Sequence, residues 1–263
     1  MTTTISDDAA SAAIDAACRT LHLPTVRAEA GPVADAAVRD RLTHRAYLAE
    51  LLSAETDARG IRRRERRIKE ARFPRLKTLE QFDASATPDI PSSLLTTLAQ
   101  GAWIDRGEPL VLLGDSGTGK SHLLIALGIA ACHQGRSVRY VTAASLVNEL
   151  VEAADDRQLA RTLARYGPID LLCLDELGYL QLDTRGAELL FQVLTDREER
   201  ASVAVASNAA FSEWGQTFTD PRLAAVVVDL LTFNAHIIHT GTGSYRLRSA
   251  RAKTTTKGTA TNS

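Results

Sequence analysis

Glycines, a lysine and a hydroxyl residue stand together at residues 114–121, in the order GDSGTGKS. This run satisfies the P-loop pattern G-x-x-x-x-G-K-[ST]; it follows an apolar run and opens an apolar helical stretch. Glycines let backbone N–H groups curl around a phosphate, and the helix dipole adds to the attraction. The lysine can reach the β- and γ-phosphates, and the hydroxyl can bind Mg²⁺. The predicted nucleotide site comprises Gly114, Asp115, Ser116, Gly117, Thr118, Gly119, Lys120, Ser121 and His122, with Ser121 also a metal ligand.

Two adjacent carboxylates, Asp175 and Glu176, end the apolar run at 171–174. At the carboxyl end of a parallel strand, Asp175 would lie beside the P-loop and hold Mg²⁺, directly or through water. Glu176 would be placed to orient and deprotonate an attacking water molecule. An apolar run that ends in two acids is often only a strand that meets a turn. Together with the P-loop, however, it indicates a site for ATP hydrolysis.

Asn208 closes the next apolar run, at residues 201–207. Its side chain could contact the γ-phosphate or the attacking water, which would make it a second catalytic residue beside Glu176. The alternative is an asparagine that forms a turn after a strand, a position that this residue favours.

The composition is that of a globular protein without a membrane segment. Of 263 residues, 44% are hydrophobic and 24% charged, and no stretch reaches the roughly 18 apolar residues that a membrane span needs. The acidic amino-terminal residues do not resemble a secretory signal. Cys18, Cys132 and Cys173 are far apart in apolar contexts, which favours buried free thiols in a reducing compartment. These features predict a cytoplasmic protein with no membrane partner.

The segment 59–77 is strongly basic although the chain is nearly neutral. It contains ten Lys or Arg and two Glu, a net charge of +8 in a chain of net charge −1. Charge runs are often solvated helix faces or protein-docking surfaces, but the density of arginine favours contact with nucleic-acid phosphates. Such contacts would be sensitive to salt and would not read sequence. The predicted DNA contacts are Arg62, Arg63, Arg64, Arg66, Arg67 and Lys69.

Apolar periodicity predicts the order of helices and strands. Helices are expected at 5–22 and 33–72, separated by a break at 23–32 that contains two prolines and a glycine. Short apolar runs then alternate with helical stretches. This alternation predicts an α/β fold whose parallel sheet is covered on both faces. The strand-like runs are 109–114, 137–142, 169–176, 201–207 and 235–240, and the further helices are 94–105, 119–134, 143–165, 184–200 and 219–231.

The same reading divides the chain into segments. The predictions are a helical amino-terminal domain with the basic helix at 1–73, a proline-containing linker at 74–91, an ATP-binding domain at 92–249 and a tail at 250–263. The tail is poor in apolar side chains and is predicted to be disordered.

Several longer stretches resemble one family. From about residue 21 to residue 248 the chain resembles the IstB-type ATP-binding proteins, the helper ATPases of insertion sequences, and more distantly the DnaC-type helicase loaders. The P-loop alone would indicate only a nucleotide-binding protein, whereas LDELGYL together with SNAAFSEWG is much more specific. The matching stretches are LPTVR (23–27), FPRLKTLEQFD (73–83), GDSGTGKSHL (114–123), LLCLDELGYLQLD (171–183), LLFQVLTDREER (189–200), SNAAFSEWGQTFTDPRLAA (207–225) and GSYRLR (243–248).

The resemblance implies a P-loop AAA+ domain with a central parallel five-stranded sheet, preceded by a small α-helical domain. It implies ATP and Mg²⁺ as cofactors, with Lys120 and Ser121 at the phosphates and the metal. It further implies that Asp175 is the metal carboxylate, Glu176 the catalytic base and Asn208 the sensor. Family members bind double-stranded DNA, form multimers on it and assist a transposase. Duplex DNA, a transposase and further copies of this chain are therefore the expected partners.

One departure from the family bears on hydrolysis. Members commonly carry an arginine where this chain has Leu230. That arginine is the best candidate for a finger inserted into a neighbouring subunit's site, and such fingers are worth about 10³–10⁵ in rate in other NTPases. Arg197 and Arg222, which lie in matching stretches, are the candidate substitutes. We expect a protein that binds ATP and hydrolyses it weakly.

Two other functions compete with this interpretation. A helicase loader of the DnaC type would act in DNA replication, with a protein as its main partner. The arginine-rich helix favours the transposition helper over the loader. A small-molecule kinase would use the same P-loop, but Asp175, Glu176 and Asn208 suit activation of water better than transfer of phosphate to an acceptor.

Overall fold

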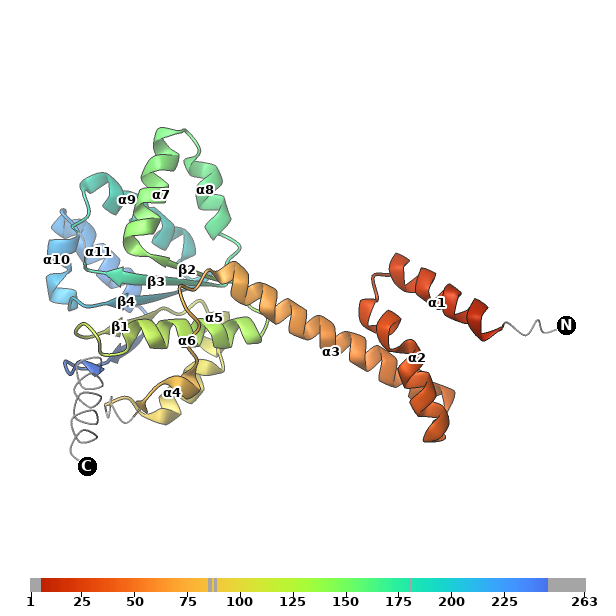
Figure 1. Cartoon of the computed structure of the whole chain (residues 1–263). Coiled ribbons are helices and arrows are strands. Elements are labelled where there is room, and N and C mark those ends of the chain that lie inside the picture. The colour runs from red at the N-terminus through yellow and green to blue at the C-terminus, as the bar shows by residue number, and fades with distance from the viewer. Residues whose placement is uncertain (1–5, 85–86, 88, 180, 246–263) are drawn as a thin grey trace, which may run out of the picture. The chain divides into compact units, whose positions relative to one another are not determined.

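The chain forms two units whose boundary falls inside one long helix, α3 (His44–Ala71). The computed structural model describes residues 6–84, 87, 89–179 and 181–245. The two compact units are residues 1–66 and 67–263, and each makes most of its contacts within itself (Figure 1). The predicted disordered tail at 250–263 lies outside the described residues.

The first unit contains α1 (Asp7–Thr20), α2 (Pro24–Arg39) and most of α3. The predicted break at 23–32 is wrong, because α2 begins there. Pro24 stands in the first turn, where its missing N–H is no loss. Pro32 lies inside α2 and removes one backbone hydrogen bond, whereas the start of this helix is anchored by α3.

That anchoring comes from Glu55, a buried residue of α3. Its carboxylate accepts hydrogen bonds from the amides of Thr25 (2.8 Å) and Val26 (3.1 Å) at the start of α2. It also accepts hydrogen bonds from the guanidinium groups of Arg59 (2.8 Å) and Arg62 (3.2 Å). Burial alone would raise the pKa of Glu55, but these hydrogen bonds lower it from 4.5 to about 2. An ionised carboxylate therefore satisfies the free amides and the dipole at this helix end.

The predicted helix at 33–72 is also wrong, because the chain breaks between α2 and α3. α2 ends in a Schellman motif, in which the Leu42 amide donates to the Ala37 carbonyl (2.9 Å). Arg41 has the positive φ of 53° that the motif requires. Glycine usually occupies this position because it has no Cβ. Here an arginine occupies it, so no glycine in the sequence indicated where the helix ends.

Two predicted helices are divided in the second unit. The predicted helix 143–165 divides at Arg157, which has φ 57°, again without a glycine. The predicted helix 94–105 divides at Gly101, which has φ 74°. The resulting helices are α4 (Ser92–Ala99), α5 (Ala102–Asp105), α7 (Ala143–Asp155) and α8 (Leu159–Tyr166).

The second unit contains a five-stranded sheet in the order β2-β3-β4-β1-β5. Every neighbouring pair is parallel, so the carboxyl ends of all the strands lie along one edge. All five predicted strands are confirmed. They are β1 (Leu110–Leu113), β2 (Val138–Thr142), β3 (Leu171–Leu177), β4 (Ser202–Ser207) and β5 (His236–His239).

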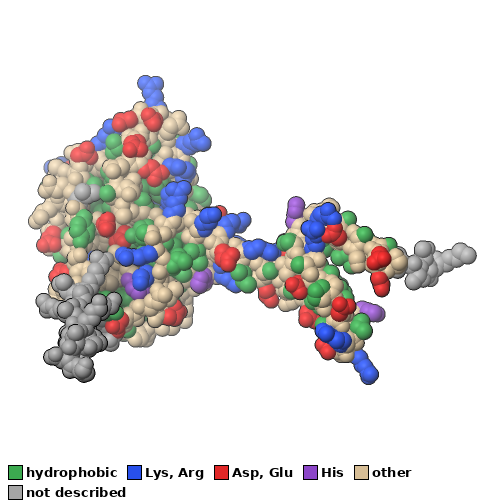
Figure 2. Space-filling view, viewed as in Figure 1, with side chains coloured by type: hydrophobic (Ala, Val, Ile, Leu, Met, Phe, Trp, Pro, Cys, Tyr) green, Lys and Arg blue, Asp and Glu red, His purple; other side chains and the backbone are tan. Residues whose placement is uncertain are grey.

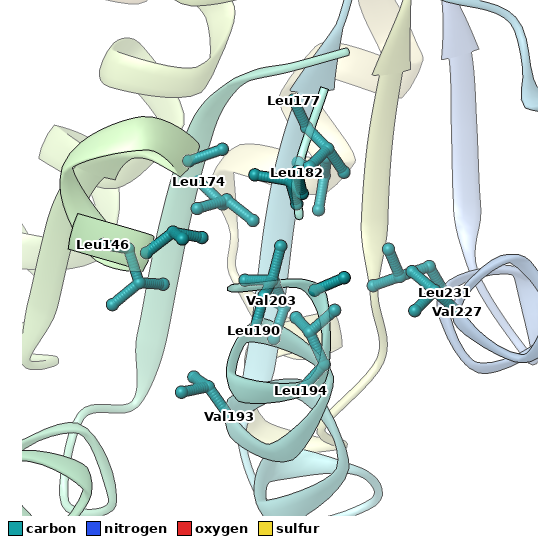
Figure 3. Packing of buried hydrophobic residues seen from close by; sticks show 14 of the residues in the cluster. Leu146, Leu174, Leu177, Leu182, Leu190, Val193, Leu194, Val203, Val227 and Leu231 are labelled. Atoms are coloured by element: carbon teal, nitrogen blue, oxygen red, sulfur yellow. The ribbon is translucent and has the colours of Figure 1, made fainter. Parts of the chain in front are cut away.

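Alternate strand residues face two separate hydrophobic clusters. Val111 and Leu172 pack with α7, α9 and α11, in the cluster shown in Figure 3, whereas Leu110 and Leu171 pack with α4 and α6. Because side chains alternate with period two, strands buried on both faces read as continuous apolar runs. The covering helices include α6 (Lys120–His133), α9 (Thr184–Arg197), α10 (Trp214–Thr217) and α11 (Pro221–Thr232), with 3-10 turns η1 (Leu79–Gln81) and η3 (Phe211–Glu213).

Candidate functional site

The loop between β1 and α6 has the backbone geometry of a phosphate cradle. Gly114, Gly117 and Gly119 have φ angles of 149°, 83° and 104°, which side chains rarely permit. At Gly119 space is also lacking, since a Cβ there would lie 2.9 Å from Cε2 of Phe82. Helix α6 begins at Lys120, so the free amides of its first turn complete the anion site.

Lys120 lies within the curve of this loop. It is 8% exposed, and its Nζ donates to the carbonyl oxygens of Gly114 (2.6 Å) and Asp115 (2.7 Å). The ammonium group can exchange these carbonyls for phosphate oxygens, which form stronger, charge-assisted hydrogen bonds. Ser121 is the next residue, half-buried in the first turn of α6, where a P-loop hydroxyl meets the metal.

Residues just after β5 support the loop from behind. The Thr240 and Thr118 hydroxyl groups are hydrogen-bonded at 2.6 Å, and the Asp115 amide donates to the Gly241 carbonyl at 3.1 Å. Both contacts are made because β5 lies beside β1 in the sheet. Thr240 is 122 residues from Thr118 and belongs to no motif, so sequence reasoning did not identify it.

A hollow of about 210 Å³ opens beside the P-loop. Two basic residues, Arg75 and Lys77, contribute to its wall, so the hollow is positively charged even apart from Lys120. The Tyr245 amide donates to the Gly117 carbonyl at 3.0 Å and places that tyrosine at the rim. The charge and the free amides fit a nucleoside triphosphate. The lining residues are Arg75, Lys77, Gly117, Gly119, Lys120, Ser121, His122 and Tyr245.

His122 joins the P-loop helix to the segment that follows α3. Its Nε2 lies 2.9 Å from the Thr78 carbonyl, and its ring meets Phe82 edge-on with 5.4 Å between centroids. Burial lowers the pKa of this imidazole. The sequence predicted a nucleotide-binding residue here, and the structure adds a structural contact to Thr78 and Phe82 that no motif indicated.

The acid pair lies at the carboxyl end of β3. Asp175 is 3% exposed, whereas Glu176 is exposed to solvent. The chain turns sharply between them: Glu176 has φ 61°, and the pairing of β3 with β4 shifts register after Leu174. The Glu176 amide donates to Oδ1 of Asp175 at 2.8 Å. The kink separates the two acids into a buried carboxylate and an accessible one.

The donor set at this edge fits Mg²⁺ better than a transition metal. A carboxylate and a hydroxyl are the hard oxygen ligands that Mg²⁺ takes, with phosphate oxygens and water as the remainder. Asp175 would supply the first and Ser121 the second. Among the described residues, no cluster of three or more His, Cys, Asp or Glu side chains could hold a metal by itself.

Asn208 follows β4, the strand between β3 and β1. Its side chain thus belongs to the same edge of the sheet as Asp175 and the P-loop. Its Oδ1 is buried and accepts no hydrogen bond from any described residue. A Cβ at Gly178 would lie 3.2 Å from this oxygen, so the asparagine faces the turn after Glu176.

Leu230 lies far from this site. It is buried near the end of α11 and lines a small hollow at the amino ends of the strands, the edge opposite the P-loop. Arg197 cannot act as a finger, because it is 2% exposed and donates to the carbonyls of Tyr166 and Ile169, each at 2.7 Å. Burial lowers its pKa to about 10. Arg222 is exposed at the start of α11.

A second candidate surface, which we call the basic hollow, lies in the first unit. It measures about 850 Å³ and collects residues from α1, the start of α2 and α3. Asp15 pairs with Arg19 and Arg27, and Glu55 pairs with Arg59 and Arg62. The lining residues are Cys18, Arg19, His22, Leu23, Pro24, Arg27, Arg59, Arg62, Arg63 and Arg66.

The basic hollow adds four basic or titratable residues to the predicted DNA contacts. Arg19, His22, Arg27 and Arg59 join the predicted Arg62, Arg63 and Arg66 there. Figure 2 shows the Lys and Arg side chains, in blue, along α3. The predicted contacts Arg64 and Lys69 are exposed on α3 outside the hollow. Arg67 is half-buried, and its Nε is buried with no hydrogen-bond partner among the described residues.

The fold and the nucleotide edge define the class of the protein. The chain is similar in structure to AMPPCP-bound DnaA from Aquifex aeolicus, with TM-score 0.53 and 22% identity over 64% of this chain and 50% of that chain. It is also similar to DnaI, with TM-score 0.52 and 19% identity over 62% of this chain and 90% of that chain. The five-stranded sheet with its P-loop therefore has the predicted AAA+ fold and is preceded by a helical region, as predicted.

The chain belongs to the family described as IstB-like ATP binding protein, which matches residues 16–253. It is 37% identical to the insertion sequence IS21 putative ATP-binding protein of Pseudomonas aeruginosa, over 82% of this chain and 81% of that protein. It is 35% identical to the insertion sequence IS5376 putative ATP-binding protein of Geobacillus stearothermophilus, over 89% of this chain and 93% of that protein. The prediction of ATP as ligand is thereby confirmed. Within the described residues, no helix is long and apolar enough to cross a membrane.

Proposed function

We propose that this ATP-binding protein hydrolyses ATP with Mg²⁺ while assembled on double-stranded DNA, and that it thereby assists a transposase. The observation that carries the proposal is the arrangement at one edge of the sheet. Lys120 lies inside a glycine cradle, and Asp175 and Glu176 end a strand of the same parallel sheet. These are the parts that phosphoryl transfer to water requires.

Each residue at that edge has a distinct proposed role. Lys120 binds the β- and γ-phosphates, and Ser121 with Asp175 would hold Mg²⁺, which neutralises charge that develops on the phosphates. Glu176, exposed beside the buried Asp175, would accept the proton of the attacking water. Asn208 would orient that water or the γ-phosphate. The free Oδ1 of Asn208 among the described residues supports a role as acceptor.

The proposed DNA surface is the basic hollow together with the exposed part of α3 that belongs to the first unit. Arginine forks suit phosphate oxygens, and the hollow contains more arginines than Asp15 and Glu55 can neutralise. Arg63 makes no hydrogen bond or ion pair with any residue that the structure describes, so it is available to a phosphate. We leave Arg67 out of this surface because its Nε is buried.

The transposase is proposed as partner because the relatives are insertion-sequence proteins. The DnaC-type loader of replicative helicases remains the alternative, and likeness in fold to DnaI does not decide between them. Assembly into a homo-oligomer is part of the proposal. Leu230 lies at the opposite edge of the sheet from the P-loop, so an arginine there could serve only another subunit's site.

The test is ATP hydrolysis by the purified chain with and without duplex DNA, with Lys120→Ala as the blank and ATP binding measured in parallel. The expected result is slow hydrolysis that DNA stimulates and that the blank lacks. ATP binding without hydrolysis, with or without DNA, would contradict the ATPase function and would direct attention to Leu230. Hydrolysis at the same rate with and without DNA would contradict the proposed role of DNA but not the ATPase function.

A further inference from the structure

Asp175 is held by a tyrosine on the neighbouring strand. The hydroxyl group of Tyr140 donates to Oδ2 of Asp175 at 2.6 Å, while the Glu176 amide donates to Oδ1 at 2.8 Å. Each oxygen of this buried carboxylate therefore has a fixed donor. The plane of the carboxylate is set before any metal arrives, and each oxygen keeps a second lone pair for a metal or a metal-bound water.

The register of the sheet explains this contact. Tyr140 of β2 pairs with Cys173 of β3, two residues before Asp175. Because strand side chains alternate, Cys173 and Asp175 point to the same face of the sheet. That face is the one covered by α6, where Cys173 and Tyr140 pack in the same cluster. The tyrosine side chain is long enough to place its hydroxyl group beside Asp175, although the Tyr140 backbone pairs with Cys173.

The ring of Tyr140 is itself confined. Phe73 packs against it with 6.0 Å between ring centroids and 57° between the planes. Phe73 in turn fills the space over Gly128 of α6, where a Cβ would lie 2.9 Å from the phenylalanine ring. This packing holds the Tyr140 hydroxyl group beside Oδ2 of Asp175.

We propose that Tyr140 is a positioning residue for the metal carboxylate: its hydroxyl holds Asp175 in the orientation that receives Mg²⁺ together with ATP. This inference rests on the proposed function, in which Asp175 is the metal carboxylate. Hydrogen bonds to metal-ligating groups are typically worth 10–100-fold in metal affinity. The contribution of Tyr140 should therefore be visible in the Mg²⁺ requirement rather than in the affinity for ATP without metal.

The test is a Mg²⁺ titration of ATP binding by the full chain carrying Tyr140→Phe, together with direct titration of Mn²⁺ by electron paramagnetic resonance in the presence of ATP. The metal concentration at half-saturation should rise about tenfold. ATP binding in EDTA should be unchanged. Tyr166→Phe is the matched control, because it deletes a hydroxyl that donates to Glu149 at 2.7 Å, away from the nucleotide edge. It should leave the metal requirement unaltered.

A metal requirement in Tyr140→Phe equal to that of the wild type and of Tyr166→Phe would overturn the proposal. If Tyr140→Phe does not fold, Phe73→Leu is the second variant. It keeps the hydroxyl but frees the ring, and it should raise the metal requirement in the same direction, by less; no change would again overturn the proposal. If ATP binding by the wild type did not depend on Mg²⁺, the proposed function itself would be contradicted, because Asp175 would not be a metal ligand.

A double-mutant cycle separates positioning from general damage to the fold. With Asp175→Asn already present, Tyr140→Phe should raise the metal requirement no further, since the carboxylate that the tyrosine orients is gone. An additional increase of the same tenfold size in that background would contradict the assignment, because Tyr140 would then act independently of Asp175.

Discussion

The P-loop and the basic hollow both present positive charge to an anion, but they are built from different parts. The P-loop uses backbone amides, glycines with positive φ and one lysine that is 8% exposed. The basic hollow uses long arginine side chains from three helices, and Asp15 and Glu55 hold four of them in ion pairs. Main-chain geometry therefore determines the positive charge of the P-loop. The excess of arginines over carboxylates determines that of the basic hollow.

This difference predicts how each surface responds to change. A cradle of amides around one ammonium group should lose its function when that group is removed, because Arg75 and Lys77 line the wall of the hollow and Lys120 alone lies within the loop. A hollow with several arginines shares its charge, so each substitution should weaken binding by a limited factor and in a salt-dependent manner. The following predictions test this contrast, beginning with the largest expected effect.

Lys120→Ala should lower ATP affinity about 100-fold or more and abolish hydrolysis, because the ammonium group lies within the cradle where the phosphates are proposed to bind. DNA affinity without nucleotide should not change. Calorimetric titration with ATP and fluorescence anisotropy with labelled duplex DNA measure the two. Arg161→Ala, which removes an exposed cation from α8 in the same unit, is the control and should change neither. An equal loss of DNA binding in Lys120→Ala would mean that the two surfaces are not separate.

Leu230→Arg should raise the DNA-stimulated turnover per subunit at least tenfold, as expected from the size of finger effects elsewhere. Leu230→Met keeps the volume without the charge and should behave as the wild type. Turnover in Leu230→Arg equal to that of the wild type would refute the idea that this position limits hydrolysis.

Arg63→Ala should weaken binding to duplex DNA about three- to tenfold and reduce the magnitude of the slope of log K against log salt by about 1. Anisotropy titrations at several salt concentrations measure both quantities. Arg45→Ala makes the same change of charge at an exposed position of α3 outside the basic hollow. If Arg45→Ala reduced affinity and slope as much as Arg63→Ala does, the hollow would have no special role.

Glu55→Gln should destabilise the first unit by about 1 kcal/mol, because two amides at the start of α2 lose a charged acceptor. Hydrogen exchange at Thr25 and Val26 should quicken about fivefold, while Glu50→Gln, at an exposed position of the same helix, should leave it unchanged. Because folding lowers the pKa of Glu55 from 4.5 to about 2, its stabilising effect is complete above pH 4.5 and is lost as the pH falls towards 2. Exchange in Glu55→Gln should lack that acid dependence.

The strands were predictable because the sheet is buried on both faces, and this burial requires apolar runs such as residues 110–113 and 171–174. Helix ends were not predictable where tertiary structure overrides local preference. Arg41 and Arg157 occupy left-handed positions that sequence reasoning assigns to glycine, and the backbone hydrogen bonds that close those helix ends can be made by any residue type. The start of α2 is held by Glu55 of α3, a contact between distant residues that no local pattern records.

The nucleotide site likewise contains residues that could be predicted from the sequence and residues that could not. The P-loop was predictable because a phosphate cradle is made by consecutive residues whose backbone must take particular φ angles. Thr240 and Tyr140 were not, because they reach Thr118 and Asp175 only through the strand order of the sheet. The basic hollow was visible as excess charge on α3, but its contributions from α1 and α2 depend on how those helices pack.

The positive φ of Glu176 has a consequence for the history of such genes. A residue other than glycine in the left-handed region carries a strain of about 1 kcal/mol or more, so this carboxylate is held at some expense to stability. If Glu176 is the base that we propose, a copy with glycine at this position would be free of that strain and would lose hydrolysis. Selection for a folded, soluble product therefore gives no protection to this acid, and only continued use of the chemistry does.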